Sequence, residues 1–115
     1  MRPHRVKFML MASDMDRAVK FYADTFGMEP LCVNPYWSEL KFGDAIIAFH
    51  GGYPGGKNPV PLTLEFDDVL AVADEIAAAG GRIIEVPKQR EGEPILLGTF
   101  RDPEGNEVFI TQFVG

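Results

Sequence analysis

The sequence has little of what several common functional sites require. Its 115 residues include one cysteine, Cys32, and two histidines, so it cannot form an internal disulfide, and these side chains alone cannot assemble a zinc site. The longest apolar run near the start, Phe8 to Ala12, is five residues and follows Lys7, far too short for a spanning helix or a signal peptide. These absences predict a soluble, cytoplasmic protein with no membrane partner.

Positive charge is also scarce. Eleven Lys and Arg against seventeen Asp and Glu give a net charge of −6, the wrong sign for a protein that neutralises many phosphates, so no nucleic-acid partner is expected. An acidic surface would attract a cationic ligand. Apolar residues make up 46% of the chain, enough for the core of one ordinary domain.

The common catalytic motifs are missing. There is no G-x-S-x-G elbow, no phosphate-binding P-loop and no G-x-G-x-x-G fingerprint. Cys32 has no base at a recognisable spacing. The motifs therefore name no catalytic residue.

What the chain does have is an internal repeat. A shift of 54 positions superposes identical residues where a strand, a helix cap and a helix stop each need them: Val6 on Val60, Leu10 on Leu64, Asp14 on Asp68, Ala23 on Ala77 and Gly27 on Gly81. The chain therefore reads as one domain, residues 1–115, made of two modules over about 5–50 and 60–113. The glycine- and proline-rich segment 51–59 joins them, either as a surface connection or as a mobile flap over a pocket.

Each copy reads as a strand, a helix and three further strands. In the first, a strand over 6–12 precedes Ser13 and Asp14, which can cap a helix that ends at Gly27. In the second, a strand over 62–66 precedes Asp67 or Asp68 as the cap, and the helix ends at Gly80 and Gly81. After each helix the apolar period changes from 3.6 to 2, which predicts strands over 31–34, 37–42, 45–50, 82–86, 95–101 and 107–113.

These features resemble the vicinal oxygen chelate superfamily, which includes glyoxalase I, extradiol dioxygenases, fosfomycin-resistance enzymes and bleomycin-resistance binding proteins. The resemblance covers the whole chain and is carried by the two βαβββ modules, by a helix containing Phe21-Tyr22 and closed by Phe26-Gly27, and by a last hairpin that reads Phe100-Arg101-Asp102-Pro103-Glu104-Gly105-Asn106. It implies an α+β fold whose curved mixed sheets form half-barrels with helices on the outer face. It also implies a homodimer.

The resemblance implies where a metal would be held. Enzymes of this superfamily bind a metal through His, Glu or Gln on the first and last strands of each module. Carried over one at a time, these positions are Lys7, Pro61, Phe109 and either Ile47 or Ala48. Proline and apolar side chains have no donor atoms and lysine is cationic near neutral pH, so no metal and no other cofactor is expected. A metal held by His50, Glu65 and a third ligand is the alternative.

Strand alternation predicts which side chains face the cavity. On the first strand Lys7, Met9 and Met11 share the face away from the helix, as do Pro61, Thr63 and Glu65 in the second copy. Tyr36 and Trp37 offer flat aromatic faces for a planar ligand. The predicted ligand-binding residues are Lys7, Met9, Met11, Tyr36, Trp37, His50, Glu65 and Phe109.

Each of these residues also has a plainer interpretation. Met9, Met11 and Phe109, with Phe113, either line a pocket or fill the half-barrel or a dimer contact. Lys7 either replaces the metal as a fixed charge, where it binds a ligand oxyanion or pairs with Glu65, or Lys7 and Glu65 are a solvated pair at the sheet edge. Trp37 either stacks on a ligand or belongs to the core, and His50 lies at the rim.

Two functions remain. The first is a metal-independent small-molecule binding protein of the bleomycin-resistance type, with an organic ligand in an apolar cavity between modules. The second is a glyoxalase- or dioxygenase-like lyase or isomerase with atypical or no metal ligands, which uses side chains such as Lys7, Glu65 or His50. The missing donor atoms favour the first.

Overall fold

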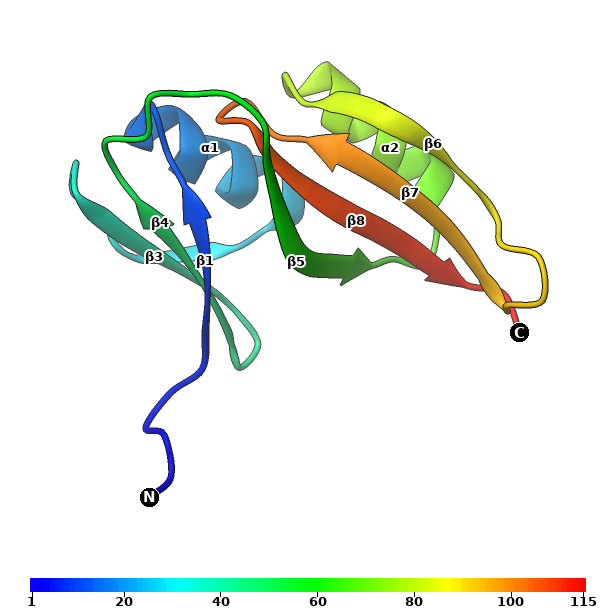
Figure 1. Cartoon of the computed structure of the whole chain (residues 1–115), viewed down its shortest axis with the longest axis horizontal. Coiled ribbons are helices and arrows are strands. Elements are labelled where there is room, and N and C mark those ends of the chain that lie inside the picture. Colours follow the sequence, from blue (N-terminus) through cyan, green and yellow to red (C-terminus); the bar gives the residue numbers. More distant parts are fainter. The chain divides into compact units, whose positions relative to one another are not determined.

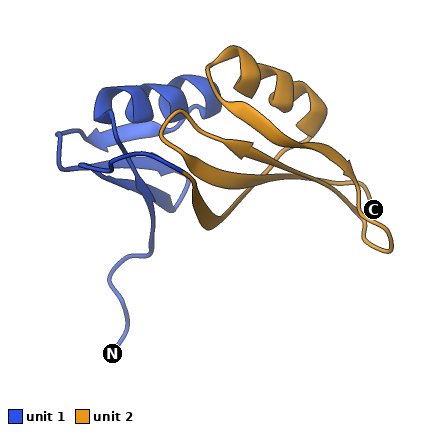
Figure 2. Ribbon diagram, turned by 45° about the horizontal axis from the view of Figure 1, so that its top comes forward, with its two compact units in different colours: residues 1–56 blue, residues 57–115 orange.

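The computed structural model describes residues 1–115, which form two compact units, 1–56 and 57–115 (Figure 2). Each unit contains one helix and one mixed four-stranded sheet (Figure 1), so the predicted α+β fold of two βαβββ modules is confirmed. The boundary, between Gly56 and Lys57, lies inside the predicted linker 51–59, whose last two residues already belong to a strand.

Unit 1 has its strands in the spatial order β1-β4-β3-β2. The strand β1 is parallel to β4, and the other neighbours are antiparallel. The helix α1 therefore carries the chain from one edge of the sheet to the other, which leaves β4 and β3 in the middle. The elements are β1 (Lys7–Met11), α1 (Met15–Phe26), β2 (Glu29–Cys32), β3 (Trp37–Phe42) and β4 (Ala45–His50).

The helix α1 has the predicted ends and covers one face of its sheet. Asp14 caps it by accepting a hydrogen bond from the Arg17 amide at 3.1 Å. Gly27 ends it with φ +70°, a left-handed conformation that favours glycine. The Tyr22 ring packs on the Phe49 ring of β4, with centroids 5.2 Å apart. Phe49 therefore marks the helix side of the sheet.

The opposite side of each sheet, away from the helix, is called the open face. Because side chains alternate along a strand, Ala48 points to the open face of unit 1 while Phe49 points to α1. Met9 pairs with Ala48, so Lys7, Met9 and Met11 share that face, as predicted. The choice between Ile47 and Ala48 is thereby resolved in favour of Ala48.

Unit 2 repeats the arrangement in the order β5-β8-β7-β6. Its first strand begins four residues earlier than predicted, because residues with a linker-like composition pair with β8 from Asn58 onward. Pro59 is tolerated there because β5 is an edge strand. The elements are β5 (Asn58–Glu65), α2 (Val69–Ala78), β6 (Arg82–Gln89), β7 (Ile95–Arg101) and β8 (Asn106–Phe113).

The helix α2 is joined directly to β8. Asp68 caps it by accepting from the Ala71 amide at 3.1 Å, and the Val69 amide donates to Gln112 Oε1 at 2.9 Å. Gln112 therefore lies on the helix side, and Phe109 and the residues two apart from it lie on the open face of unit 2. Neither helix is long and apolar enough to cross a membrane.

The hairpin between β7 and β8 is closed by a buried carboxylate. Asp102 is only 3% exposed. Its Oδ1 accepts from the amides of Glu104 and Asn106, both at 2.9 Å, and its Oδ2 accepts from Asn106 Nδ2 at 2.8 Å. This Asp-Pro-Glu-Gly-Asn turn is thus a structural device of unit 2.

Candidate functional site

An ion pair occupies the centre of the open face of unit 1. Lys7 Nζ lies 2.7 Å from Glu39 Oε2, and Trp37 Nε1 donates to the same oxygen at 2.7 Å. The Glu39 side chain is 11% exposed and that of Lys7 is 39% exposed. Glu39 pairs with Ala48 across β3 and β4, so the carboxylate lies beside the position expected for a metal ligand.

The surroundings of Glu39 favour its charged form. The hydrogen bonds from Lys7 and then Trp37 hold the pKa of Glu39 below its ordinary value of 4.5. Burial raises the pKa by less than these bonds lower it, and the charges of Lys7 and Arg5 lower it further. Glu39 is therefore a carboxylate near neutral pH.

Sequence reasoning missed Glu39. The sequence predicted that Lys7 would bind a ligand oxyanion or pair with Glu65. In the structure Lys7 pairs with Glu39 of its own unit, and Glu65 is an exposed residue of β5. The signal was present in the correctly predicted strand 37–42. Alternation places Trp37 and Glu39 on one face, and the tight hairpin to β4 decides that it is the open face.

The other predicted residues of unit 1 gather near this pair. Trp37 pairs with His50 across the hairpin, and their rings are perpendicular with centroids 6.3 Å apart. His50 Nδ1 lies 2.7 Å from the Gly51 carbonyl oxygen, so Nδ1 carries the proton and Nε2 is left as the acceptor. Met9 is 54% exposed. Tyr36 lies in the loop before β3 and is 82% exposed.

The two predicted residues of unit 2 lie on its own open face. Phe109 is 40% exposed and pairs with Thr63, and Glu65 pairs with Thr111. On the same face, Glu107 accepts from Arg101 Nε at 3.1 Å and Nη2 at 2.8 Å, and its other oxygen lies 3.9 Å from Lys57 Nζ. The structure thus gives unit 2 a second carboxylate that is held by cations.

The side chains at the implied metal positions do not fit a metal. Lys7 is cationic and bonded to Glu39, while Ala48 and Phe109 have no donor atoms. Pro61 lies where the pairing of β5 with β8 shifts register, between Pro59 and Thr63. No group of three or more His, Cys, Asp or Glu side chains is arranged to hold a metal ion, including any around His50 or Glu65.

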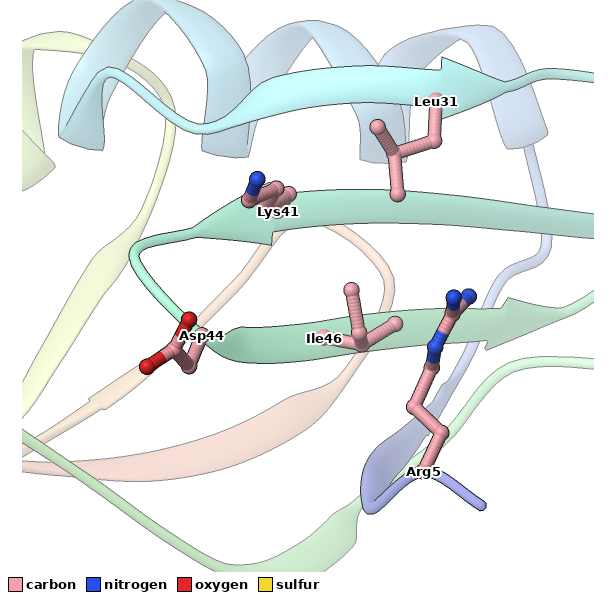
Figure 3. Close-up of a pocket in the computed structure, with 5 residues that line it drawn as sticks. All are labelled: Arg5, Leu31, Lys41, Asp44 and Ile46. Carbon is pink, nitrogen blue, oxygen red and sulfur yellow. The ribbon is translucent and has the colours of Figure 1, made fainter.

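A cavity opens at one end of the open face of unit 1. Its volume is about 360 Å³, and Figure 3 shows the side chains that line it: Arg5, Leu31, Lys41, Asp44 and Ile46. A second hollow of about 480 Å³ lies beside the start of α1 and the loop 33–35. None of the residues lining the first cavity was singled out from the sequence.

The fold and the sequence together define the family. The Glyoxalase/Bleomycin resistance protein/Dioxygenase superfamily model matches residues 4–110, and the chain belongs to this superfamily. The resemblance to the vicinal oxygen chelate superfamily is thereby confirmed. Membership alone leaves open whether a given chain binds or transforms its small molecule.

The similar proteins include enzymes, by their descriptions, and a binding protein. The chain is 30% identical to a probable lactoylglutathione lyase of Vibrio parahaemolyticus, covering 90% of this chain and 86% of that protein. It is 32% identical to a probable chloroplastic lactoylglutathione lyase of Arabidopsis thaliana over 89% of this chain, but it spans only 34% of that protein. A solved antibiotic binding protein from Streptomyces sp. CB03234 is 26% identical, with a TM-score of 0.76 and 97% of both chains covered.

Proposed function

We propose that this chain binds a small organic molecule on its open faces without a metal, in the manner of the bleomycin-resistance branch. One observation carries the proposal: Lys7, at the first implied ligand position, is bonded to Glu39 at 2.7 Å. The other implied positions, Ala48, Pro61 and Phe109, have no donor atoms.

The composition of the open face supports binding of an organic molecule. In unit 1, Met9 and Met11 offer flexible, polarisable surface that adapts to irregular shapes. Trp37 offers a ring whose orientation is fixed by its bond to Glu39, and His50 offers a free Nε2 acceptor. In unit 2, Phe109 and Glu65 contribute an apolar surface and a charge. Apolar walls with a few placed polar groups are typical of ligand sites.

A solved relative supports the same function. The Streptomyces protein, described as an antibiotic binding protein, matches this chain over nearly the full length of both. We propose that the present chain likewise sequesters a small molecule. An exposed free thiol at Cys32 suits the cytoplasm, and assembly as a homodimer is part of the proposal.

A lyase is the second candidate, because two relatives are named as probable lactoylglutathione lyases. In this chain such chemistry would need a different arrangement from a metal centre. Glu39 is a weak base because its pKa is lowered, and His50 is the other side chain of the open face of unit 1 with a proton-accepting atom, Nε2.

The test compares metal binding with ligand binding. Protein purified without chelator is analysed for metals and titrated with Zn²⁺ and Ni²⁺, and its thermal stability is measured against a panel of antibiotics and α-keto aldehydes, with and without glutathione. We expect no stoichiometric metal and a raised Tm with at least one compound, since a ligand at about 100 times its Kd stabilises by roughly 2.7 kcal/mol.

Two variants on one strand locate the binding. Trp37→Leu removes an open-face ring, whereas Phe42→Leu removes an exposed ring from the helix side of β3. The first should weaken binding of the stabilising compound and the second should not. A stoichiometric metal together with turnover of an α-keto aldehyde would instead establish the lyase.

A further inference from the structure

The cavity in Figure 3 has the size and lining of a site for a small organic ion. Leu31 and Ile46 supply apolar surface, and three charged side chains surround them. Ile46 lies between Arg5 and Asp44 in this view, and Lys41 projects from the neighbouring strand. A volume of about 360 Å³ is at the small end of the range for ligand sites.

The charges of this cavity are not satisfied within the chain. Neither Arg5 nor Lys41 forms an ion pair or a side-chain hydrogen bond, and the Asp44 carboxylate is not within 4.0 Å of either cation. Arg5 acts on Glu39 through its charge alone. Glu39 is already held by Lys7 and Trp37. Two cations therefore face a cavity that holds one carboxylate.

The second unit shows what two cations at this position bind. Lys41 pairs with Ile46 in the β3–β4 hairpin, as Arg101 pairs with Glu107 in the β7–β8 hairpin. Ile46 is also the partner of Lys7 on β1, and Glu107 is the partner of Pro59 on β5. Ile46 and Glu107 are thus equivalent positions of the two modules.

The remaining cations correspond as well. Arg5 lies two residues before Lys7, the partner of Ile46, and Lys57 lies two residues before Pro59, the partner of Glu107. Because the pairing of β5 with β8 shifts register between Pro59 and Thr63, this is a correspondence of strand pairing and not of the 54-residue repeat. In unit 2 both cations approach the Glu107 carboxylate, Arg101 at 2.8 Å and Lys57 at 3.9 Å. In unit 1 the cations are kept while the carboxylate is replaced by an apolar side chain.

We propose that this cavity binds the carboxylate of a small organic acid, whose anionic group takes the place that Glu107 occupies in unit 2. The apolar body of the acid lies on Leu31 and Ile46. Asp44 leaves the lining with a net charge of about +1, which favours a monoanion over a dianion. The inference rests on the proposed function and names its ligand class; it replaces the expectation of a cationic ligand.

The test uses 4-methylbenzoate as the probe and 4-methylbenzamide as its neutral isostere, with affinities from isothermal titration and backbone amide shifts at low salt. We expect 4-methylbenzoate to bind about tenfold more tightly than the amide, with the largest shifts in residues 5, 41 and 44–46. Arg5→Gln and Lys41→Gln should each weaken its binding about fivefold. Lys20→Gln, at an exposed lysine of α1, is the matched control and should change nothing.

Asp44→Asn tests the sign of the effect. It removes a repelling carboxylate and should tighten 4-methylbenzoate binding about twofold to fivefold. If the cavity instead recognised cations through Asp44, the variant would leave 4-methylbenzoate binding without this gain. Equal affinity for acid and amide, no binding of 4-methylbenzoate, or unchanged binding in both cation variants would overturn the inference. A stabilising compound found in the antibiotic screen that is insensitive to Arg5→Gln and Lys41→Gln would leave the proposed function standing while this inference fails.

Discussion

The two units carry the same strands but place the cation-bound carboxylate of the open face differently. In unit 1 the carboxylate is Glu39 on the third strand, opposite Ala48, and its cation comes from the first strand. In unit 2 it is Glu107 on the last strand, and its closest cation, Arg101, comes from the neighbouring strand. Position for position, Thr99 stands where Glu39 does, since Thr99 pairs with Phe109 as Glu39 pairs with Ala48.

This difference teaches how a duplicated scaffold gives its copies different sites. Relative to Glu39, the carboxylate of unit 2 lies on the adjacent strand, two residues from the position equivalent to Ala48; this keeps it on the open face but gives it other neighbours. Unit 1 consequently has a closed charge pair at its centre and unpaired cations at its end. Unit 2 has its charges paired at the end and Thr63, Thr99 and Phe109 at the centre.

The largest expected difference in stability between the two units lies in their last hairpin turns, between β3 and β4 in unit 1 and between β7 and β8 in unit 2. Asp102→Ala removes the carboxylate that accepts from three buried donors and should lower the free energy of unfolding by about 3 kcal/mol. Asp44→Ala changes an exposed turn residue of unit 1 and should cost less than about 0.5 kcal/mol. Urea unfolding of the full chain measures both. Equal costs would mean that the two turns do not differ as described.

The carboxylate of unit 1 should make stability depend on pH. Glu39→Gln should lower the free energy of unfolding by about 1.5 kcal/mol at pH 7, because Lys7 and Trp37 lose a charged acceptor. The pKa of Glu39 is lower in the folded chain, so its stabilisation is complete above the unfolded value of about 4.5 and is lost as pH falls through the folded value. The difference between wild type and variant should therefore shrink toward pH 3.

A double-mutant cycle isolates the pair. Lys7→Met and Glu39→Gln, alone and together, should give a coupling of about 1 kcal/mol at pH 7 that decreases as the pH falls below 4.5 and through the lowered pKa of Glu39, measured by urea unfolding. Additive effects at pH 7 would show that the contact between Lys7 and Glu39 contributes nothing to stability.

The smallest expected change in stability comes from making unit 1 resemble unit 2. Ile46→Glu loses apolar burial but places a carboxylate between Arg5 and Lys41, so the net change should stay within about 1 kcal/mol. The new side chain should compete with 4-methylbenzoate and weaken its binding more than tenfold in isothermal titration. Ile46→Gln is the control for shape. If it abolishes binding equally, the added carboxylate is not the cause.

Most of the fold could be predicted because its signals are local. Strands 37–42, 45–50 and 95–101 were predicted with their observed bounds, since alternation and tight turns limit them on both sides. The helix caps Asp14 and Gly27 were confirmed for the same reason. The start of β5 and the end of β6 were misplaced, because pairing with β8 and β7 extends them beyond what composition indicates. The strand predicted over 31–34 was also misplaced: β2 spans Glu29–Cys32, because its pairing with β3 begins at Glu29, opposite Lys41.

The candidate site was less predictable because it depends on register. The open-face position of Lys7 followed from alternation, but its partner Glu39 required knowing which strands are neighbours. Arg5 lies before β1 in a segment without periodicity, and its correspondence to Lys57 follows only from the paired strands. The sequence therefore predicted which side chains of the first strand lie on the open face, whereas the strand pairing was needed to find which charged residues lie next to them.

Trp37 is the single tryptophan of the chain, and its indole N–H donates to the carboxylate that also holds Lys7. The protein thus carries a built-in fluorophore at the middle of the open face of unit 1. Its emission should respond when Glu39 takes up a proton or when a molecule settles against the ring, so occupancy of this face can be followed by light without attaching a dye.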